Sequence, residues 1–284
     1  MGENMNGVLL VNKQKHVTSR DVVNELTHIF NTKKIGHTGT LDPIASGVLV
    51  CTIGKYTKLN DVLTSKYKEY IATMELGYLT DTLDNTGTIL SKSDNIPNED
   101  RIKEVIYSYK KKYMQEVPIY SSVKVNGRKL YEYARNNETV ELPIKEVDIK
   151  EIEILSINDR EIVFKTLVSK GTYIRSLIRD IGKTLGCHAS MTDLIRTKQG
   201  KFYIEDTYTI DEIKDGNYKI LDIEDVLDLD IVDTSDNLYK LISNGVKIDY
   251  KSNKDFILFR YKGEDISLYQ KECDKYSMFI SIKA

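Results

Sequence analysis

Apolar residues recur along most of the chain with two spacings, one typical of buried strands and the other of amphipathic helices. Short apolar or alternating runs predict strands over residues 7–12, 47–53, 69–76, 147–157 and 161–168. Apolar residues at helical spacing predict helices over residues 18–31, 98–112, 128–136 and 172–185. Strands and helices that alternate in this way favour the mixed α/β (α+β) class, with one domain spanning residues 1–230.

The end of the chain has a different pattern and predicts a small β-rich module over residues 231–284. A helix at 237–243 precedes an Asn244-Gly245 turn, and strands are expected at 255–261, 264–269 and 277–283. Around the boundary between the first domain and this module, residues 205–236 hold twelve acidic residues and two Lys, a local charge of −10. That composition favours a solvated acidic connector.

The whole chain of 284 residues is almost neutral, with 41 Lys and Arg, 43 Asp and Glu and a net charge of −2. Taken alone, this balance argues against a nucleic-acid partner. Setting aside the −10 of residues 205–236 leaves +8 for the rest of the chain. The average therefore hides a cationic part that suits RNA.

The sequence shows no sign of a membrane span or a metal site. It has no run of about 18 apolar residues. Cys51, Cys187 and Cys273 are too scattered for a disulfide framework or a zinc site, and no pair of His has ligand spacing. We expect no bound metal, and a location in the reducing cytoplasm.

The densest cluster of candidate chemistry is GHTGTLDPIASG, residues 36–47, between the first helix and the second strand. Pro43 fixes its own φ and restricts Asp42 to extended backbone, so the Asp42 carboxylate would be held rigidly near His37. A rigid loop that carries a carboxylate and an imidazole is typical of a catalytic site. The alternative is an ordinary turn, since Asp-Pro is common in turns.

Two other segments gather cations. In SKGTYIRSLIRDIG (169–182), Arg175 and Arg179 share one helix face, and Arg pairs well with a carboxylate or a phosphate. The alternative is a solvated basic face with Tyr173 in the core. PIYSSVKVNGRKLYEYAR (118–135) suits phosphates and stacked bases, or is an amphipathic helix with half-buried tyrosines. Its cations are Lys124, Arg128, Lys129 and Arg135.

Three other segments resemble known functional motifs but do not match them fully. Residues 47–56 look like a phosphate-binding loop, but Tyr56 stands where a Ser or Thr must reach magnesium. Residues 121–124 and 93–95 match parts of the penicillin-binding motifs in the wrong order, with no K-T-G after them.

Taken in order, five segments closely resemble the TruB family of tRNA pseudouridine synthases, from residue 7 to about 200. They are GVLLVNKQKHVTSRDVV, GHTGTLDPIASGVL, KEYIATMELGYLTDTLDNTG, PIYSSVKVNGRKLYEYAR and SKGTYIRSLIRDIG. The resemblance implies a pseudouridine-synthase catalytic domain with a central mixed, mainly antiparallel sheet, and a short PUA-like RNA-binding domain after it. The chain departs from the family pattern at Pro118, where two prolines are usual, at Ser122, where Ala is usual, and at Asn137, where Gly is common.

The resemblance also assigns residues. Asp42 would be the catalytic carboxylate, and Arg175 would pair with it and keep it charged and oriented. His37 would fill the stack vacated by a flipped base, and Tyr70 would stack under that base. The substrate-binding set is Lys13, His37, Tyr70, Tyr173 and Arg175, and the expected RNA contacts are Lys124, Arg128, Lys129, Arg135, Arg179 and Arg196.

The implied reaction is the isomerisation of uridine 55 in the tRNA T-loop to pseudouridine. It needs no cofactor, because no net oxidation or hydrolysis occurs, and a single chain without a membrane partner would suffice. Asp42 could attack the anomeric carbon or act as a base at the ribose C2′, and the sequence leaves both routes open. Two rivals are an RNA-binding protein without activity, which would not need Asp42, Tyr70 or Arg175, and another α/β enzyme, which would carry a nucleotide fingerprint.

Overall fold

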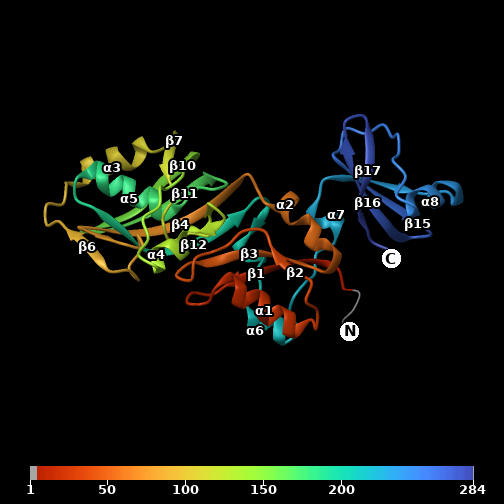
Figure 1. Cartoon of the computed structure of the whole chain (residues 1–284), viewed down its shortest axis with the longest axis horizontal. Coiled ribbons are helices and arrows are strands. Elements are labelled where there is room, and N and C mark those ends of the chain that lie inside the picture. Colours follow the sequence, from red (N-terminus) through yellow and green to blue (C-terminus); the bar gives the residue numbers. More distant parts are fainter. Residues whose placement is uncertain (1–4, 284) are drawn as a thin grey trace.

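The computed structural model describes residues 5–283 and divides them between a long nine-stranded sheet and a smaller sheet near the C-terminus (Figure 1). The long sheet has the strand order β1-β3-β12-β4-β11-β10-β7, with β2 beside β3 and β13 beside β12. The strands are β1 (Gly7–Lys13), β2 (Ile35–His37), β3 (Ser46–Ile53), β4 (Tyr67–Leu76), β7 (Lys112–Glu116), β10 (Ile144–Asn158), β11 (Glu161–Ser169), β12 (Ala189–Gln199) and β13 (Phe202–Tyr203). The β12–β3 pair is parallel and the other pairs of this sheet are antiparallel, which confirms the predicted mixed sheet.

The central strand β12 is the main element that the hydrophobic pattern did not predict. It lies between β3 and β4, and its pairing with β4 shifts register between Met191 and Asp193 and again between Arg196 and Lys198. Each such β-bulge adds a residue and breaks the two-residue alternation of buried and exposed side chains. Its sequence therefore reads as irregular although the strand is buried in the middle of the sheet.

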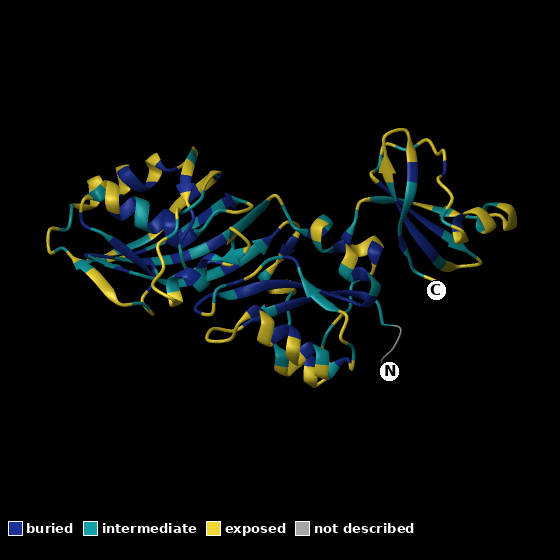
Figure 2. Cartoon of the chain, in the orientation of Figure 1, coloured by how far each residue is buried: buried dark blue, intermediate teal, exposed yellow. Residues whose placement is uncertain are grey.

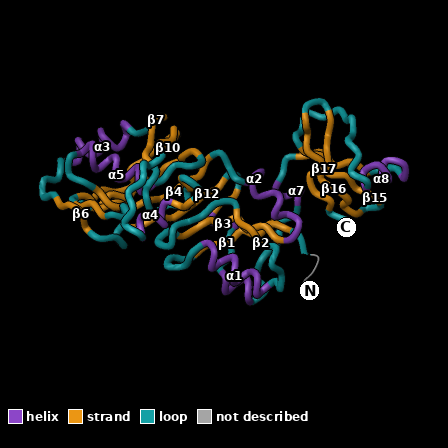
Figure 3. The backbone as a smooth tube through the Cα atoms, in the orientation of Figure 1, coloured by secondary structure: helices purple, strands orange, loops and turns teal. Residues whose placement is uncertain are grey.

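Three longer helices cover the sheet (Figures 1 and 3). Helices α3 (Glu99–Ser108) and α5 (Ile174–Leu185) pack on one face around β4, β11 and β12, and α1 (Ser19–Ile29) packs against β1 and β3. A capping box between Thr18 and Asp21 starts α1, and Gly186 ends α5 in the left-handed conformation with φ 75°. These helices confirm the predictions over 18–31, 98–112 and 172–185.

Two hairpins project from the sheet edges. Strands β5 (Tyr78–Thr80) and β6 (Ile89–Lys92) flank the turn-rich residues 80–87, and β8 (Lys124–Val125) pairs with β9 (Arg128–Lys129). The helix predicted at 128–136 is shorter, α4 (Leu130–Arg135), because Arg128 and Lys129 belong to the second hairpin. Asn126 and Gly127 both have positive φ there, as a tight two-residue hairpin turn requires.

The prediction of a solvated acidic connector over residues 205–236 is wrong. Tyr208 exchanges backbone hydrogen bonds with β1 through Leu10 and Asn12, and Leu221 exchanges two more with Val8. The segment forms η2 (Ile204–Asp206), α6 (Ile210–Lys214) and α7 (Ile223–Val226), and its apolar side chains enter two core clusters. It is therefore an integral layer against β1.

The acidic residues of this segment have local structural roles. Thr209 and Glu212 form a capping box at the start of α6, and Asp222 and Asp225 form one at the start of α7. Carboxylates accept hydrogen bonds from the free backbone N–H groups at a helix start and favour its positive dipole end. Because two short helices follow one another here, the acidic residues at their starts lie close together in the sequence.

The C-terminal sheet is separate, as predicted. It has the order β14-β15-β16-β17, with β14 (Leu229–Asp233), β15 (Phe256–Tyr261), β16 (Glu264–Glu272) and β17 (Lys275–Ser281), and α8 (Asp236–Ser243) packs on it. A buried cluster joins it to β1, β3, η1 (Gly54–Leu59), α2 (Asn60–Leu63) and α7 (Figure 2). The two sheets are thus held together by shared core. Among residues 5–283, no helix is long and apolar enough to span a membrane.

We expect Ile223→Ala to lower the free energy of unfolding by about 3 kcal/mol, because this fully buried side chain in α7 would leave a cavity between the two sheets. Denaturant unfolding measures the change. Ile231→Ala, at a side chain that is 42% exposed on β14, is the control and should change stability by less than about 0.5 kcal/mol. Equal, small effects of both changes would restore the connector interpretation.

Candidate active site

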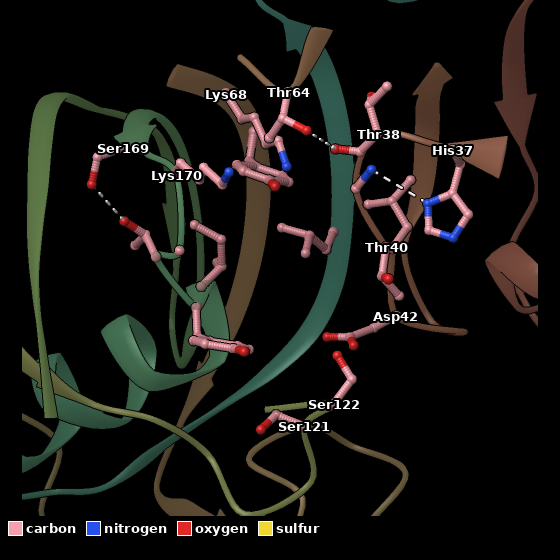
Figure 4. A pocket seen from close by; sticks show the side chains of 18 of the residues that line it. His37, Thr38, Thr40, Asp42, Thr64, Lys68, Ser121, Ser122, Ser169 and Lys170 are labelled. Carbon is pink, nitrogen blue, oxygen red and sulfur yellow. Dashed lines mark hydrogen bonds between the residues drawn. The ribbon is translucent and has the colours of Figure 1, made fainter. Parts of the chain in front are cut away.

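A cavity of about 470 Å³ opens between the 36–47 loop, β4, the 118–122 segment and the start of α5 (Figure 4). Four segments that are far apart in the sequence meet there. The predicted site residues that line the cavity are His37, Asp42, Tyr70, Tyr173 and Arg175. In the close-up, Asp42 points into the cavity toward Ser121 and Ser122.

The loop that carries Asp42 is fixed from several sides. The Leu41 N–H donates to Ser19 Oγ at 2.9 Å, which ties the loop to the start of α1. The His16 N–H donates to the Pro43 carbonyl at 2.7 Å. Gly47, where β3 begins, has φ 102°, and a Cβ there would lie 2.3 Å from the Arg196 carbonyl oxygen. The loop therefore holds Asp42 as rigidly as its sequence suggested.

Arg175 fixes the carboxylate itself. Its Nε donates to Asp42 Oδ2 at 2.9 Å, and its Nη1 and Nη2 donate to the carbonyls of Thr82 and Tyr120 at 2.9 and 3.1 Å. The Arg175 side chain is 5% exposed, whereas that of Asp42 is 35% exposed. The expected pair of Asp42 and Arg175 is therefore present, but it consists of one hydrogen bond. The other two guanidinium nitrogens donate to the segments that contain Thr82 and Tyr120.

The sequence interpretation missed Asp84, which it treated only as part of a turn. This carboxylate is 6% exposed, and its Oδ2 lies 4.0 Å from Arg175 Nε. Hydroxyl groups of Thr82 and Thr86 donate to its Oδ1 at 2.7 and 2.5 Å. The density of Asp and Thr in TDTLDNTG was a signal for such a bonded carboxylate, because buried charges need partners. Asp84 gives the buried guanidinium a second negative charge.

The aromatic and imidazole groups of the cavity come from different elements. Tyr70, on β4, is 8% exposed. The backbone of Tyr173 exchanges two hydrogen bonds with the Gln115 side chain, at 2.8 and 3.2 Å, and burial raises the pKa of its phenol. His37 Nδ1 accepts from the Gly39 N–H at 3.3 Å, and burial, helped by nearby cations, lowers its pKa. The lowered pKa of His37 and the raised pKa of Tyr173 both favour the uncharged form of these two rings near neutral pH.

Two predicted contact residues do not reach the cavity. Lys13 is fully buried, and its Nζ donates to the carbonyls of Gln14 and Val17 at 2.9 and 2.8 Å. Burial lowers the pKa of Lys13 to about 8, although the charge of Asp42 opposes the shift. Lys13 therefore stabilises the backbone that follows β1, and its ammonium does not face a ligand in the cavity.

Arg196 is also fully buried, so the prediction that it contacts RNA is not supported by its position. Its Nε donates to the Val48 carbonyl at 2.7 Å and its Nη2 to the Gly39 carbonyl at 3.1 Å. The guanidinium thus lies behind the 36–47 loop, where it satisfies carbonyl groups on both sides of Asp42. We assign Arg196 a positioning role.

The other predicted RNA contacts lie on the surface. Arg128 donates twice to Glu138, at 2.8 and 3.1 Å, and Arg179 pairs with Glu116 and Asp180. The 118–135 segment stacks its cations on tyrosine rings, with Arg128 4.3 Å from the Tyr133 ring centre. Lys129 and Arg135 lie 5.5 and 5.3 Å from the Tyr131 ring, and Lys124 is exposed. This surface offers charge and aromatic faces together, as RNA-binding surfaces do.

Family models match most of the chain. Residues 27–174 match the N-terminal domain of TruB family pseudouridylate synthases, and residues 175–233 match a tRNA pseudouridylate synthase B C-terminal domain. The tRNA pseudouridine synthase B of Oceanobacillus iheyensis is 40% identical over 281 residues, covering 94% of this chain and 93% of that protein. The enzyme of the same name from Francisella tularensis is 42% identical over 218 residues, covering 76% and 72%.

Solved structures agree on the fold. A chain in the crystal structure of a Cbf5–Nop10–Gar1 complex superposes with a TM-score of 0.68 and 25% identity, covering 98% of this chain and 84% of that one. A chain of an H/ACA RNP bound to a substrate RNA containing 2′-deoxyuridine gives a TM-score of 0.67 at 24% identity, covering 98% and 85%. Fold and site together define a pseudouridine synthase. Within that class, the chain belongs to the TruB family.

We expect Arg175→Lys to lower kcat for pseudouridine formation by about 100-fold, because one ammonium cannot hold Asp42, Thr82 and Tyr120 in the geometry of the guanidinium, and displacements near 1 Å cost that much. Single-turnover assays measure the rate. Arg160→Lys, at a surface ion pair with Asp94, is the control and should leave kcat unchanged. A variant as fast as the wild type would mean that the three-way hold is unnecessary.

The substitution Arg196→Met tests whether Arg196 positions the 36–47 loop or contacts RNA. We expect it to lower the free energy of unfolding by about 3 kcal/mol and to lower kcat, because the carbonyl groups around the catalytic loop lose buried donors. The salt dependence of RNA binding should not change, since no phosphate contact is lost. A shallower salt dependence, matching that of Lys124→Met, would reinstate Arg196 as an RNA contact.

Proposed function

We propose that this chain isomerises uridine 55 in the T-loop of tRNA to pseudouridine, with Asp42 as the catalytic carboxylate. The observation that carries the proposal is the Asp42–Arg175 pair at the wall of the cavity, in a chain of the TruB family. The relatives named tRNA pseudouridine synthase B support tRNA as the substrate. The cavity volume of about 470 Å³ is within the range typical of small-molecule sites.

The reaction breaks the bond between N1 of uracil and C1′ of the ribose, and joins C5 of the same uracil to C1′. The C5 proton leaves and N1 gains one, so atoms and charge balance without an external reagent. Asp42 Oδ2 is held by Arg175, and Oδ1 makes no hydrogen bond within the described part of the chain. The free oxygen can serve as a nucleophile at C1′ or as a base at C2′, and both routes fit this arrangement.

The target uridine lies within a folded loop, so it must be flipped out, at a cost of a few kcal/mol. The proposed roles are stacking by Tyr70 under the flipped base and bracing of the vacated stack by His37. Tyr173 would position the base from the start of α5. In the free protein these side chains already line one cavity, so little ordering remains for the substrate to drive.

The wider RNA contacts belong to the same proposal. The 118–135 segment, with Lys124, Arg128, Lys129 and Arg135, would grip the RNA together with Arg179. The C-terminal domain, whose sheet begins with β14 at Leu229, two residues before the expected boundary at residue 231, would add PUA-like contacts. We further propose that the enzyme acts as a monomer, without a cofactor, in the cytoplasm.

Asp42→Asn should abolish pseudouridine formation and leave tRNA affinity within about threefold, because the amide keeps the shape and loses the charge and basicity. Tritium release from labelled, unmodified tRNA measures turnover, and filter binding measures affinity. Asp61→Asn is the matched control, since Asp61 also lines the cavity but is not bonded to Arg175, and it should keep activity.

Two outcomes would contradict the proposal. Normal turnover by Asp42→Asn would remove this residue from the chemistry. Tight tRNA binding by the wild type without any pseudouridine would favour the alternative of an RNA-binding protein without activity.

A further inference from the structure

The cavity has a cationic side that the proposed chemistry does not use. Lys68, on β4, and Lys170, just after β11, both line the cavity, and Arg196 lies behind the 36–47 loop. In Figure 4, Lys68 and Lys170 lie together near Thr64, away from Asp42 and Ser122. One side of the cavity therefore gathers positive charge, while the catalytic carboxylate lies on the other.

The Lys68 ammonium has no acceptor within the described part of the chain: it makes no hydrogen bond and no ion pair there. A Cβ at Gly39 would lie 2.6 Å from Lys68 Nζ and 3.7 Å from Arg196 Nη1, so both cations border the same small space. Lys68 is half-buried, and the three buried cations of the site differ from it. Lys13 and Arg196 each donate to backbone carbonyls, and Arg175 donates to Asp42 and two carbonyls.

An ammonium that is half-buried without a partner loses part of its hydration, and a ligand can supply the missing negative charge. Burial, followed by the charges of Arg196 and Lys170, lowers the pKa of Lys68 to about 7. An anion at this place would compensate the partial burial of Lys68, and a phosphate can accept charge-assisted hydrogen bonds from both lysines that line this side of the cavity.

The position suits a phosphate of the substrate. Lys68 and Tyr70 are two residues apart on β4, so their side chains leave the same face of the strand about 7 Å apart. If Tyr70 stacks on the flipped uracil, Lys68 lies about one nucleotide away from that base. A backbone phosphate next to the target uridine would therefore reach it.

We propose that Lys68 and Lys170 form a binding site for one backbone phosphate of the substrate RNA, adjacent to the flipped uridine. This inference rests on the proposed function, because it takes RNA as the ligand. The site anchors the backbone on one side of the cavity while Asp42 acts at the sugar on the other. A side chain at Gly39 would displace the Lys68 ammonium from its present place.

The first test compares Lys68→Met, Lys68→Arg and the control Lys103→Met, which removes a surface lysine paired with Glu99 on α3. Lys68→Met should raise KM for an unmodified RNA stem-loop roughly tenfold. Between about 50 and 200 mM salt, the slope of log affinity against log salt should become shallower by about 0.7. Lys68→Arg should restore the slope, and Lys103→Met should match the wild type.

The second test identifies the phosphate. Single phosphates flanking the target uridine are replaced by neutral methylphosphonates, one at a time. One replacement should weaken binding to the wild type and to Lys103→Met, but not weaken binding to Lys68→Met any further. Lys170→Met, at an exposed position, should give a smaller loss at the same phosphate and keeps the test valid if Lys68→Met does not fold.

The results distinguish this inference from the proposed function. Active wild type with unchanged KM and salt slope in Lys68→Met and Lys170→Met would overturn the phosphate site alone. Equal weakening of wild type and Lys68→Met by every methylphosphonate would also overturn it. Competition by inorganic phosphate without any effect of methylphosphonates would show a site for a free anion, which contradicts the assignment to RNA. Wild type that makes no pseudouridine would overturn the proposed function instead.

Discussion

The buried guanidinium of Arg175 joins three segments that the sequence separates widely: the catalytic loop through Asp42, the 80–87 turn through Thr82, and the 118–122 segment through Tyr120. A buried cation must be paired and hydrogen-bonded, and removing one of its partners is strongly destabilising. This one side chain therefore links three segments of the cavity wall. The orientation of the carboxylate depends on the packing of α5, which buries that side chain.

The other cations of the site divide into two groups by what their donors bind. Lys13 and Arg196 are fully buried and donate to backbone carbonyls, so they support the structure around Asp42. Lys68 and Lys170 border the cavity instead, and Lys68 makes no hydrogen bond or ion pair with residues 5–283. Some cations near the cavity therefore support the backbone, and others are available for the proposed phosphate. The hydrogen bonds that each side chain makes within the protein distinguish the two groups.

The charge balance of the chain has a structural explanation of the same kind. Acidic residues of the 205–236 segment cap the short helices α6 and α7, while the segment itself packs on β1. Part of its negative charge comes from residues that cap helices. The net charge of the segment therefore did not indicate whether the segment is solvated. The cationic remainder and this acidic layer belong to one folded unit, which reaches the C-terminal sheet through a shared core.

The sequence by itself determined the elements whose side-chain spacing is regular and the loop whose backbone is restricted locally. The apolar faces of α1 and α5, the strands β1, β3 and β11, and the Asp42-Pro43 turn follow from interactions among near neighbours. The family motifs likewise pointed to Asp42 and Arg175.

Only the tertiary structure decided the rest, because it depends on contacts between distant residues. The bulges of β12 hid a central strand, and burial turned Arg196 from an expected RNA contact into a brace for the loop. Asp84 and Lys68 became candidate site residues only when folding placed Asp84 beside Arg175 and Lys68 at the cavity. A sequence pattern records spacing along one segment, whereas the partner of a buried charge is supplied by whichever segment packs against it.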